Sequence, residues 1–473
     1  MENKFDFGMI GLGVMGRNLL YNMADHGFSV IGLDLDKEKA DALETGATKG
    51  TQVKGTTDTQ DFIKQLATPR KITLLVPAGK PVDAVVNSLL PYLDKGDIII
   101  DGGNSHYTDT LRRVKDLEEK GFHFMGMGVS GGEKGARFGP SIMPGGDKEA
   151  YNHIKPLLEA VSAKVNGEPC TAYMGKDAAG HYVKMVHNGI EYAIMQTLSE
   201  VYDLLKTGQD YSNEDLHKLF KNWNEGRLQS FLVEITRDIF ATKDTESNNY
   251  LVDMILDKAG AKGTGKWTSQ DAMDTGVSIP TIDVSVSMRT ISAYKNERLA
   301  AAKIYQPVVE KILTDKDEFA KQLEDTLFLT MIICYAQGLA LLVKASEELS
   351  MEIPLHDVVK IWRGGCIIRS TLLEDFYKAY NNNPKLANIL LDESISKLVK
   401  PCIASMRAVV SQATKSGIAV AAIQCSLAYL ESYTSAKMPT NLIQAQRDDF
   451  GSHTYQRIDK EGIFHTEWET HEN

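Results

Sequence analysis

The sequence predicts an α/β N-terminal domain with a parallel sheet, a large all-α domain and a short C-terminal tail. A strand, a glycine-rich turn, a helix and a second strand open the chain, and apolar runs of strand length follow. Beyond Asp177 the apolar residues recur with the 3.6-residue period of helices. The expected boundaries are 1–177, 178–435 and 436–473.

The first element pair surrounds a G-x-G-x-x-G turn. Strands are expected over 5–10 and 28–33, and a helix between them ends near His26. The turn consists of Gly11, Leu12, Gly13, Val14, Met15 and Gly16. The three glycines suit a tight turn, close approach of a pyrophosphate and close helix–strand packing, and Asp34 follows where an acid binds a ribose 2′-hydroxyl. This pattern predicts a Rossmann-like dinucleotide-binding domain for residues 1–177, with a ligand-free glycine turn as the alternative.

Two further apolar runs, 71–78 and 96–104, are typical of buried parallel strands. Ligands of such sheets bind at the carboxyl ends of the strands. The residues after these runs are therefore candidates for ligand contact: Val76, Pro77, Ala78, Asp101, Gly102, Gly103 and Asn104.

Residues 126–146 contain eight glycines in 21 residues. We interpret this segment as a glycine loop in which backbone N–H groups crowd against a ligand, with Ser130, Gly131 and Gly132 as the best candidates for contact. A tight crossover between strands explains the composition equally well.

Helices are expected at 178–206, 212–240 and 321–349. The first carries KMVHNGIEY, whose polar residues fall within an arc of roughly 140°. They are Lys184, His187, Asn188, Glu191 and Tyr192. One lysine, one glutamate and three directed hydrogen-bonding groups favour a functional face, although a solvated face is the ordinary alternative.

The segment 260–268, GAKGTGKWT, only approaches a phosphate-binding P-loop. Trp267 stands where serine or threonine would bind Mg²⁺, and a helical stretch rather than a strand precedes it, so we reject a nucleoside triphosphate site. A cationic turn that suits an anion remains. The tail, 444–468, is too polar to form its own core, and we expect it to be disordered or docked on another surface, such as that of a second subunit.

Composition excludes several classes of function. A formal net charge of -11 disfavours nucleic-acid binding. Five cysteines without C-x-x-C spacing indicate a reduced intracellular protein with neither a disulfide scaffold nor a zinc site. We expect neither a signal peptide nor a membrane span, because a predicted strand and turn stand at the start and no apolar run approaches about 18 residues.

Six stretches resemble the 6-phosphogluconate dehydrogenase family, and the resemblance runs nearly end to end. They are GLGVMGRNL, DIIIDGGNS, GVSGGEKGARFGPSIMPGG, AGHYVKMVHNGIEY, KGTGKWT and QAQRDDFGSHTYQR. The resemblance implies oxidative decarboxylation of 6-phospho-D-gluconate to ribulose 5-phosphate and CO₂, in the pentose phosphate pathway and gluconate utilization. It also implies a cytoplasmic homodimer whose tail reaches into the partner subunit.

Residue roles follow from the same resemblance. Lys184 matches the general base for the C3 hydroxyl, and Glu191 matches the acid that protonates C1 of the enediol. The implied substrate contacts are Asn104, Ser130, Gly131, Gly132, His187, Asn188, Tyr192, Lys262 and Arg289, with Arg447 and His453 from the tail. The implied cofactor contacts are Gly11, Leu12, Gly13, Val14, Met15, Gly16, Asp34, Leu35, Asp36, Val76, Pro77, Ala78 and Asn104. A β-keto acid decarboxylates readily, so no metal is expected.

The cofactor pattern departs from many family members, which carry an Asn-Arg-Thr-like run after the second strand and prefer NADP. This chain reads Asp34-Leu35-Asp36 instead, and Pro77 replaces a lysine common in relatives. Carboxylates accept a ribose hydroxyl and repel a 2′-phosphate, so we predict a preference for NAD. Lys37 and Lys39 weaken this argument, because a flexible lysine could reach a phosphate.

Two alternatives remain open at this point. A non-decarboxylating β-hydroxyacid dehydrogenase shares the N-terminal domain and the helix lysine, but its chain is shorter and lacks the phosphate-binding tail. A catalytically dead NAD-binding scaffold would be expected to have lost Lys184 or Glu191, and both are present.

Overall fold

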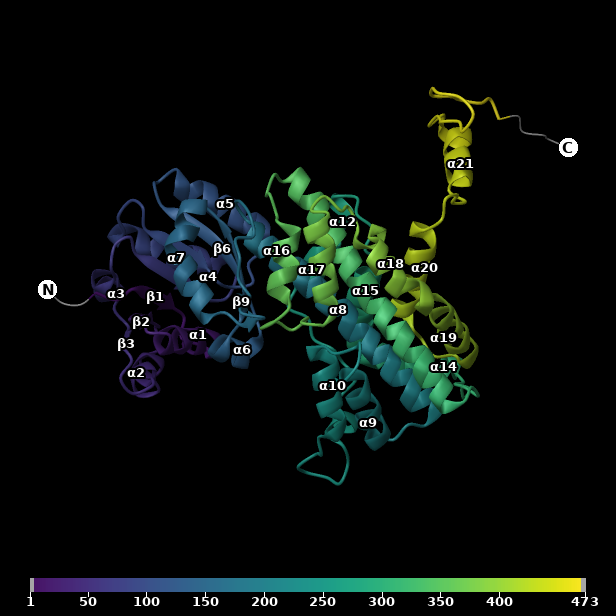
Figure 1. Cartoon of the computed structure of the whole chain (residues 1–473), viewed down its shortest axis with the longest axis horizontal. Coiled ribbons are helices and arrows are strands. Elements are labelled where there is room, and N and C mark those ends of the chain that lie inside the picture. The colour runs from purple at the N-terminus through teal and green to yellow at the C-terminus, as the bar shows by residue number, and fades with distance from the viewer. Residues whose placement is uncertain (1–3, 469–473) are drawn as a thin grey trace. The chain divides into compact units, whose positions relative to one another are not determined.

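The computed structural model describes residues 4–468 (Figure 1). Contacts within the chain divide it into two compact units, 1–426 and 427–473, and the second unit begins inside α20 (Ala421–Tyr433). Strands and helices alternate up to residue 169, and from Ala179 onward the first unit is built from helices. The expected α/β and all-α parts are therefore present, and the three domain boundaries stay a prediction.

The N-terminal part contains a seven-stranded sheet in the order β3-β2-β1-β4-β5-β6-β7, with the order reversing between β1 and β4. The strands are β1 (Phe7–Ile10), β2 (Val30–Leu33), β3 (Val53–Thr56), β4 (Lys71–Leu74), β5 (Ile98–Asp101), β6 (His123–Ser130) and β7 (Ser141–Gly146). Neighbours are parallel except for β7, which pairs antiparallel with β6. Ligands bind where such an order reverses, so the glycine turn after β1 lies at the expected place.

Several elements are shorter than the apolar runs predicted. β4 and β5 end at Leu74 and Asp101, so residues 76–78 and Asn104 lie in loops beyond the carboxyl ends of the strands. An apolar core lies on each face of the sheet. Residues of α1 (Val14–Asp25), α6 (Gly132–Phe138) and α7 (Lys148–Val161) form one core, and residues of α3 (Thr59–Gln65), α4 (Lys80–Leu89) and α5 (Tyr107–Glu118) form the other. The remaining small elements are α2 (Lys37–Thr45), η1 (Leu90–Tyr92), β8 (Lys164–Val165) and β9 (Glu168–Pro169).

The glycine-rich segment 126–146 is not the loop that its composition suggested, because most of it forms β6, α6 and β7. Several of its glycines allow close packing instead. A Cβ atom at Gly128 would lie 2.5 Å from the Cβ of Lys184, and one at Gly126 would lie 2.7 Å from Nδ1 of His181. Glycine at these positions lets the following long helix, α8, lie directly on β6.

Helices make up the rest of the first unit. They are α8 (Ala179–Asp203), a π-turn (Leu204–Gly208), α9 (Asn213–Asn224), α10 (Phe231–Ala241), α11 (Leu251–Met254), α12 (Thr264–Asp274), α13 (Pro280–Ala293), α14 (Lys295–Tyr305), α15 (Lys316–Glu348), α16 (Leu355–Trp362), α17 (Leu372–Asn382), η3 (Ile389–Leu391), α18 (Glu393–Val399), η4 (Lys400–Cys402) and α19 (Ile403–Ser416). The single helix expected at 212–240 is wrong. α9 ends before Gly226, and the Ser230 hydroxyl caps a new helix by accepting from the Val233 N–H.

The expectation that no segment is apolar enough for a membrane span also needs correction. α15 is one helix, among the described residues, whose length and composition would allow it to cross a membrane. The sequence count missed it because a few polar residues interrupt its apolar run. In the most apolar window 89% of the residues are buried inside the protein, where α15 packs along α8 (Figure 1). This is the environment of a core helix.

The second unit contains α21 (Asn441–Gly451) and an antiparallel bridge between Tyr455 and Phe464. Its centre is the carboxylate of Asp448, which is fully buried and accepts hydrogen bonds from Thr454 N, His465 Nδ1, Thr466 N and Trp468 Nε1. Burial raises the pKa of Asp448, but these hydrogen bonds outweigh it and hold the value at about 2. The tail is thus too polar for an apolar core, as expected, yet it folds around a polar one.

Candidate active site

α8 carries the polar residues of the KMVHNGIEY stretch, and this face is not a solvated one. Lys184 is 6% exposed, His187 0% and Tyr192 6%. β6, β7, α12 and α13 all pack on α8, so the polar face is enclosed by protein rather than by water. The solvated-face alternative is therefore wrong, since a solvated face leaves such groups in water.

A hydrogen-bond chain runs from Lys184 to the backbone of the segment after α16. Lys184 Nζ lies 3.5 Å from His187 Nδ1, which lies 3.0 Å from Asn188 Oδ1. His187 Nε2 lies 3.3 Å from Ser130 Oγ, which accepts from the Ile367 N–H at 3.4 Å. This network assigns the neutral tautomer in which Nδ1–H donates to Asn188 and Nε2 accepts from Ser130, so Nδ1–H can pair with Lys184 only when the lysine amine is neutral and accepts.

Burial sets the protonation of the three titratable groups in this chain. It lowers the pKa of Lys184 from its ordinary value, while the charge of Glu191 opposes the shift. Burial and the Lys184 charge together lower the pKa of His187 well below its usual range. Burial also raises the pKa of Glu191, against Lys184 and Arg289. A basic amine and a carboxylic acid are thus brought toward neutral forms on one helix face.

Cationic groups gather at the Tyr192 end of the face. The Arg289 guanidinium of α13 lies 3.5 Å above the centre of the Tyr192 ring, and its Nη1 donates to the Gly260 carbonyl at 3.3 Å. Lys262 is exposed two residues before α12 begins. Gly265 lets α12 pack closely on Tyr192, because a Cβ atom there would lie 2.6 Å from the Tyr192 ring. These groups suit a phosphate at this end of the site.

The turn after β1 fits a dinucleotide. A Cβ atom at Gly16 would lie 1.9 Å from the Gly11 carbonyl oxygen, whereas one at Gly13 would meet nothing within 4 Å. The backbone at Gly13, at the N-terminus of α1, is therefore open to a phosphate. The Asp34 carboxylate accepts from Leu12 N at 2.7 Å and from Asp36 N at 3.0 Å, which fixes it at the end of β2.

The loop after β5 presents Asn104 toward solvent between two anchored neighbours. Asp101 is fully buried and accepts from Gly103 N at 3.0 Å and from Ser105 Oγ at 2.6 Å. Arg113 Nη1 lies 3.5 Å from the same carboxylate. The backbone that carries Asn104 is thus fixed on both sides.

The structure brings part of the predicted set into direct contact. Ser130, Lys184, His187, Asn188 and Glu191 form one cluster, and Arg289 joins Tyr192. Gly131 and Gly132 follow Ser130 at the start of α6. Arg447 and His453 belong to the second unit, and both are exposed there.

Sequence reasoning missed the segment after α16. Trp362 packs edge-to-face on the His187 ring at 5.7 Å, and Ile367 N reaches Ser130. Cys366, whose Sγ donates to the Trp362 carbonyl at 3.1 Å, is fully enclosed, and burial raises its pKa to about 12. The signal was available as two successive glycines, Gly364 and Gly365, inside an otherwise helical region.

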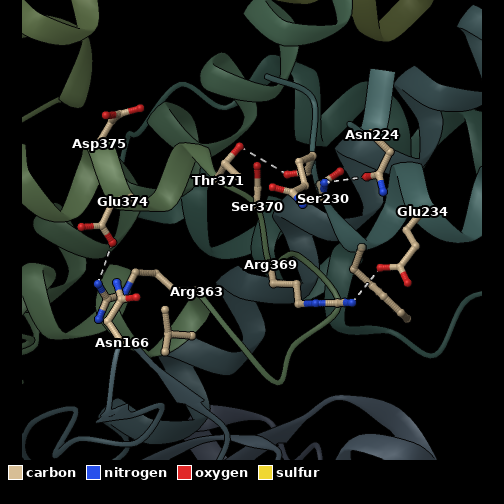
Figure 2. Close-up of a pocket in the computed structure, with 13 residues that line it drawn as sticks. Asn166, Asn224, Ser230, Glu234, Arg363, Arg369, Ser370, Thr371, Glu374 and Asp375 are labelled. Atoms are coloured by element: carbon tan, nitrogen blue, oxygen red, sulfur yellow. Dashed lines mark hydrogen bonds and ion pairs between the residues drawn. The ribbon is translucent and has the colours of Figure 1, made fainter. Parts of the chain in front are cut away.

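A cavity of 630 Å³ lies against the segment 363–371 (Figure 2). Two ion pairs line it: Arg363 Nη1 donates to Glu374 Oε2 at 2.7 Å, and Arg369 Nη2 donates to Glu234 Oε2 at 2.8 Å. None of the predicted site residues lines this cavity, so it is separate from the candidate active site.

Comparisons with known proteins agree along the whole chain. Residues 6–188 match the NAD binding domain of 6-phosphogluconate dehydrogenase, and residues 180–468 match the C-terminal domain of the same enzyme. The chain is 52% identical to a 6-phosphogluconate dehydrogenase of Bacillus subtilis named as NADP(+)-dependent and decarboxylating, and 48% identical to the decarboxylating enzyme of Escherichia coli. Each alignment covers 98% of this chain and 99% of the relative.

A solved structure agrees as well. The 6-phosphogluconate dehydrogenase of Plasmodium falciparum, described in its apo form and in complex with NADP+ and with 6-phosphogluconate, superimposes with a TM-score of 0.94 at 46% identity. The match covers 98% of this chain and 100% of the other.

Proposed function

Because the chain belongs to the 6-phosphogluconate dehydrogenase family, we propose that it converts 6-phosphogluconate to ribulose 5-phosphate and CO₂ with reduction of NAD(P). The observation that carries this proposal is the pair of Lys184 and Glu191, seven residues apart on one face of α8, whose pKa values burial shifts in opposite directions. Oxidative decarboxylation without a metal needs one such base and one such acid.

Lys184 is proposed to take the proton of the C3 hydroxyl. Its burial favours the neutral amine that a base requires. A nicotinamide dinucleotide bound at the turn after β1 would supply the hydride acceptor. His187 lies beside the Lys184 amine, and Ser130 pairs with the other ring nitrogen of His187, so the two residues position the amine.

Glu191 is proposed to act after oxidation. The resulting 3-keto acid loses its C1 carboxylate as CO₂, and the enediol that remains must receive a proton at the former C2, which becomes C1 of ribulose 5-phosphate. Burial raises the pKa of Glu191, which favours the protonated form that can deliver it. Lys262 and Arg289 are proposed to hold the phosphate and keep the substrate in register with both groups.

We propose that NAD is preferred, although the Bacillus subtilis relative is named as NADP(+)-dependent. Asp34 is fixed by two backbone donors, and Leu35 is 95% exposed where an arginine would hold a 2′-phosphate. The two lysines that weaken this argument have carboxylate neighbours. Lys37 Nζ lies 2.6 Å from Asp41, and Lys39 Nζ lies 3.4 Å from Asp36.

We propose further that the enzyme is a cytoplasmic homodimer in which Arg447 and His453 complete the partner's site. α21 and the residues after it leave Leu442, Ile443 and Phe450 more than half exposed. Apolar side chains on so small a unit are typical of a surface that another chain covers. The five free cysteines, four of them buried, support a reducing compartment.

One assay separates this function from its two alternatives. The purified protein is incubated with 6-phosphogluconate and each cofactor, and CO₂ release is measured with the absorbance of reduced nicotinamide. Equal yields of both products are expected. Reduced cofactor without CO₂ would indicate a non-decarboxylating hydroxyacid dehydrogenase, and neither product would indicate a non-catalytic scaffold.

A further inference from the structure

We propose that Asp271 of α12 is a positioning residue. It would align α12 with α8, which carries Lys184, and with the start of α5, which follows the Asn104 loop. Asp271 lies on α12 and is 6% exposed. Its Oδ1 accepts from the hydroxyl of Tyr107 at 2.5 Å, and its Oδ2 accepts from the hydroxyl of Tyr182. One carboxylate thus joins three segments. This role of Asp271 rests on the function proposed above for Lys184 and Glu191.

Each of these three segments carries an active-site residue. Tyr107 begins α5, three residues after Asn104. Tyr182 lies on α8, two residues before Lys184. Asp271 lies on α12, whose first turn follows Lys262. The carboxylate therefore sets the relative positions of a cofactor and substrate contact, the base and a cationic group.

Aromatic rings surround the Asp271 carboxylate, and two tyrosine hydroxyls donate to it. The rings of Tyr107 and Tyr182 meet edge-to-face at 4.9 Å, and His106 meets Trp267 of α12 at 4.8 Å. Burial and the Asp271 charge raise the pKa of both tyrosines, so both remain donors. Within residues 4–468 no lysine, arginine or histidine forms a salt bridge with this carboxylate. Loss of either hydroxyl would leave one of its oxygens without its donor.

α12 stays attached to α8 without Asp271. The Thr268 hydroxyl donates to the Met185 carbonyl of α8 at 3.0 Å, and its side chain fills the space beside Gly189. Substitution at Asp271 should therefore change the alignment of the helices without detaching α12. This separates a positioning role from a purely structural one.

Alignment matters because the base must reach the C3 hydroxyl while the hydride acceptor lies against C3 of the same substrate molecule. A displacement of about 1 Å in such a site can reduce the rate roughly 100-fold. The side chains proposed to hold the phosphate, Lys262 and Arg289, are both retained when a tyrosine hydroxyl is removed, and the contact of Arg289 with Tyr192 does not involve Asp271. The expected signature is thus a loss in kcat with little change in KM.

The experiment compares Tyr107→Phe, Tyr182→Phe and Asp271→Asn with two matched controls. Tyr173→Phe removes a half-buried hydroxyl that donates to the Gly146 carbonyl at 2.6 Å, away from the site. Tyr380→Phe removes a buried hydroxyl that has no hydrogen-bond partner among the described residues. We expect kcat to fall about 10- to 100-fold in the three test variants, with KM for 6-phosphogluconate within about threefold of the parent. Both controls should stay within about twofold.

A double variant tests whether the groups act as one unit. Tyr107→Phe combined with Asp271→Asn should be no slower than Asp271→Asn alone, because coupled residues are not additive. Additive losses, or a kcat within twofold of the parent in Tyr107→Phe and Asp271→Asn, would overturn the proposal.

Hydrogen exchange gives a readout that does not depend on turnover. Amides of residues 264–274 should exchange faster in Tyr107→Phe than in the parent, and not in Tyr173→Phe. Equal exchange in Tyr107→Phe and the parent would also overturn the proposal. An inactive parent with the expected exchange pattern would instead contradict the proposed function and leave the connection through Asp271 standing.

Discussion

Cofactor choice can be tested by exchanging the residues that follow β2. The double variant Asp34→Asn plus Leu35→Arg removes a carboxylate and adds a guanidinium where the 2′-phosphate of NADP would lie. Leu35 is 95% exposed, so the arginine displaces no packed side chain. Asp34 is 14% exposed and held by two backbone N–H groups, so its charge stays close to the ribose.

The expected magnitude follows from Coulomb's law. A phosphate with a charge of about -1.75 at about 6 Å from the Asp34 carboxylate, with an effective dielectric constant of about 40, is repelled by roughly 2 kcal/mol. That energy corresponds to roughly a 30-fold discrimination against NADP. Removing the repulsion and adding a charged hydrogen bond of about 1.5–3 kcal/mol should shift the NAD/NADP ratio by more than about 100-fold.

The assay is kcat/KM for NAD and for NADP at saturating 6-phosphogluconate. The ratio is the informative quantity, because Asp34→Asn also weakens one bond to the glycine turn and should lower kcat/KM for both cofactors. Leu35→Gln is the matched control, since it has a similar length and no charge. Raising the ionic strength should shrink the discrimination.

Two results would refute the reasoning. One is a parent enzyme with the higher kcat/KM for NADP. The other is an unchanged ratio after Leu35→Arg, with Leu35→Gln behaving identically. The first would mean that a flexible cation such as Lys39 leaves its carboxylate neighbours to meet the phosphate.

Further predictions concern the base, the acid and the tail. Lys184→Ala should lower kcat by about 10²–10⁴-fold, and a near-normal kcat would remove its proposed role. Because the amine must be neutral, kcat/KM should rise with pH through the pKa of Lys184, which burial lowers. Glu191→Gln removes the charge that raises the pKa of Lys184, so the pH profile of kcat/KM should move to lower pH. An unmoved profile would contradict an electrostatic interaction between Glu191 and Lys184. The Asp448 carboxylate has a pKa of about 2 in the folded tail, against about 3.9 in the unfolded chain, so it stabilises the tail fully only at pH values above about 4. Amides of residues 441–466 should therefore lose protection from hydrogen exchange as the pH falls from about 4 to 2. In Asp448→Asn the same amides should already be unprotected at pH 7. Deleting residues 441–473 should raise KM for 6-phosphogluconate sharply and weaken the dimer, whereas an unchanged KM would exclude the tail from the site.

The sequence was sufficient where the signal is local. The glycine turn, its flanking strands and Asp34 lie within about 30 residues, because helix and strand periods and turn chemistry are short-range properties. The α8 face could be identified for the same reason, since residues three and four apart must share a face. Family motifs then supplied roles that the spacing could not.

Composition misled where packing decides the outcome. The glycines of 126–146 leave a ligand-binding loop and a strand crossover equally open, and the structure shows that two of them are needed because α8 lies against β6. The tail was judged too polar for a core, and it folds around Asp448 instead. Both cases depend on contacts between residues that no local pattern relates.

The sequence by itself determined the fold class and the glycine turn of the dinucleotide-binding domain, and its family motifs led to Lys184 and Glu191 as the proposed base and acid. Only the tertiary structure decided that Lys184 and Glu191 are enclosed, and enclosure is what shifts their pKa values in opposite directions. It also decided that Asp271, 87 residues after Lys184, meets tyrosines from α5 and α8. Burial and long-range hydrogen bonds arise when distant segments pack together, and no local sequence pattern encodes them.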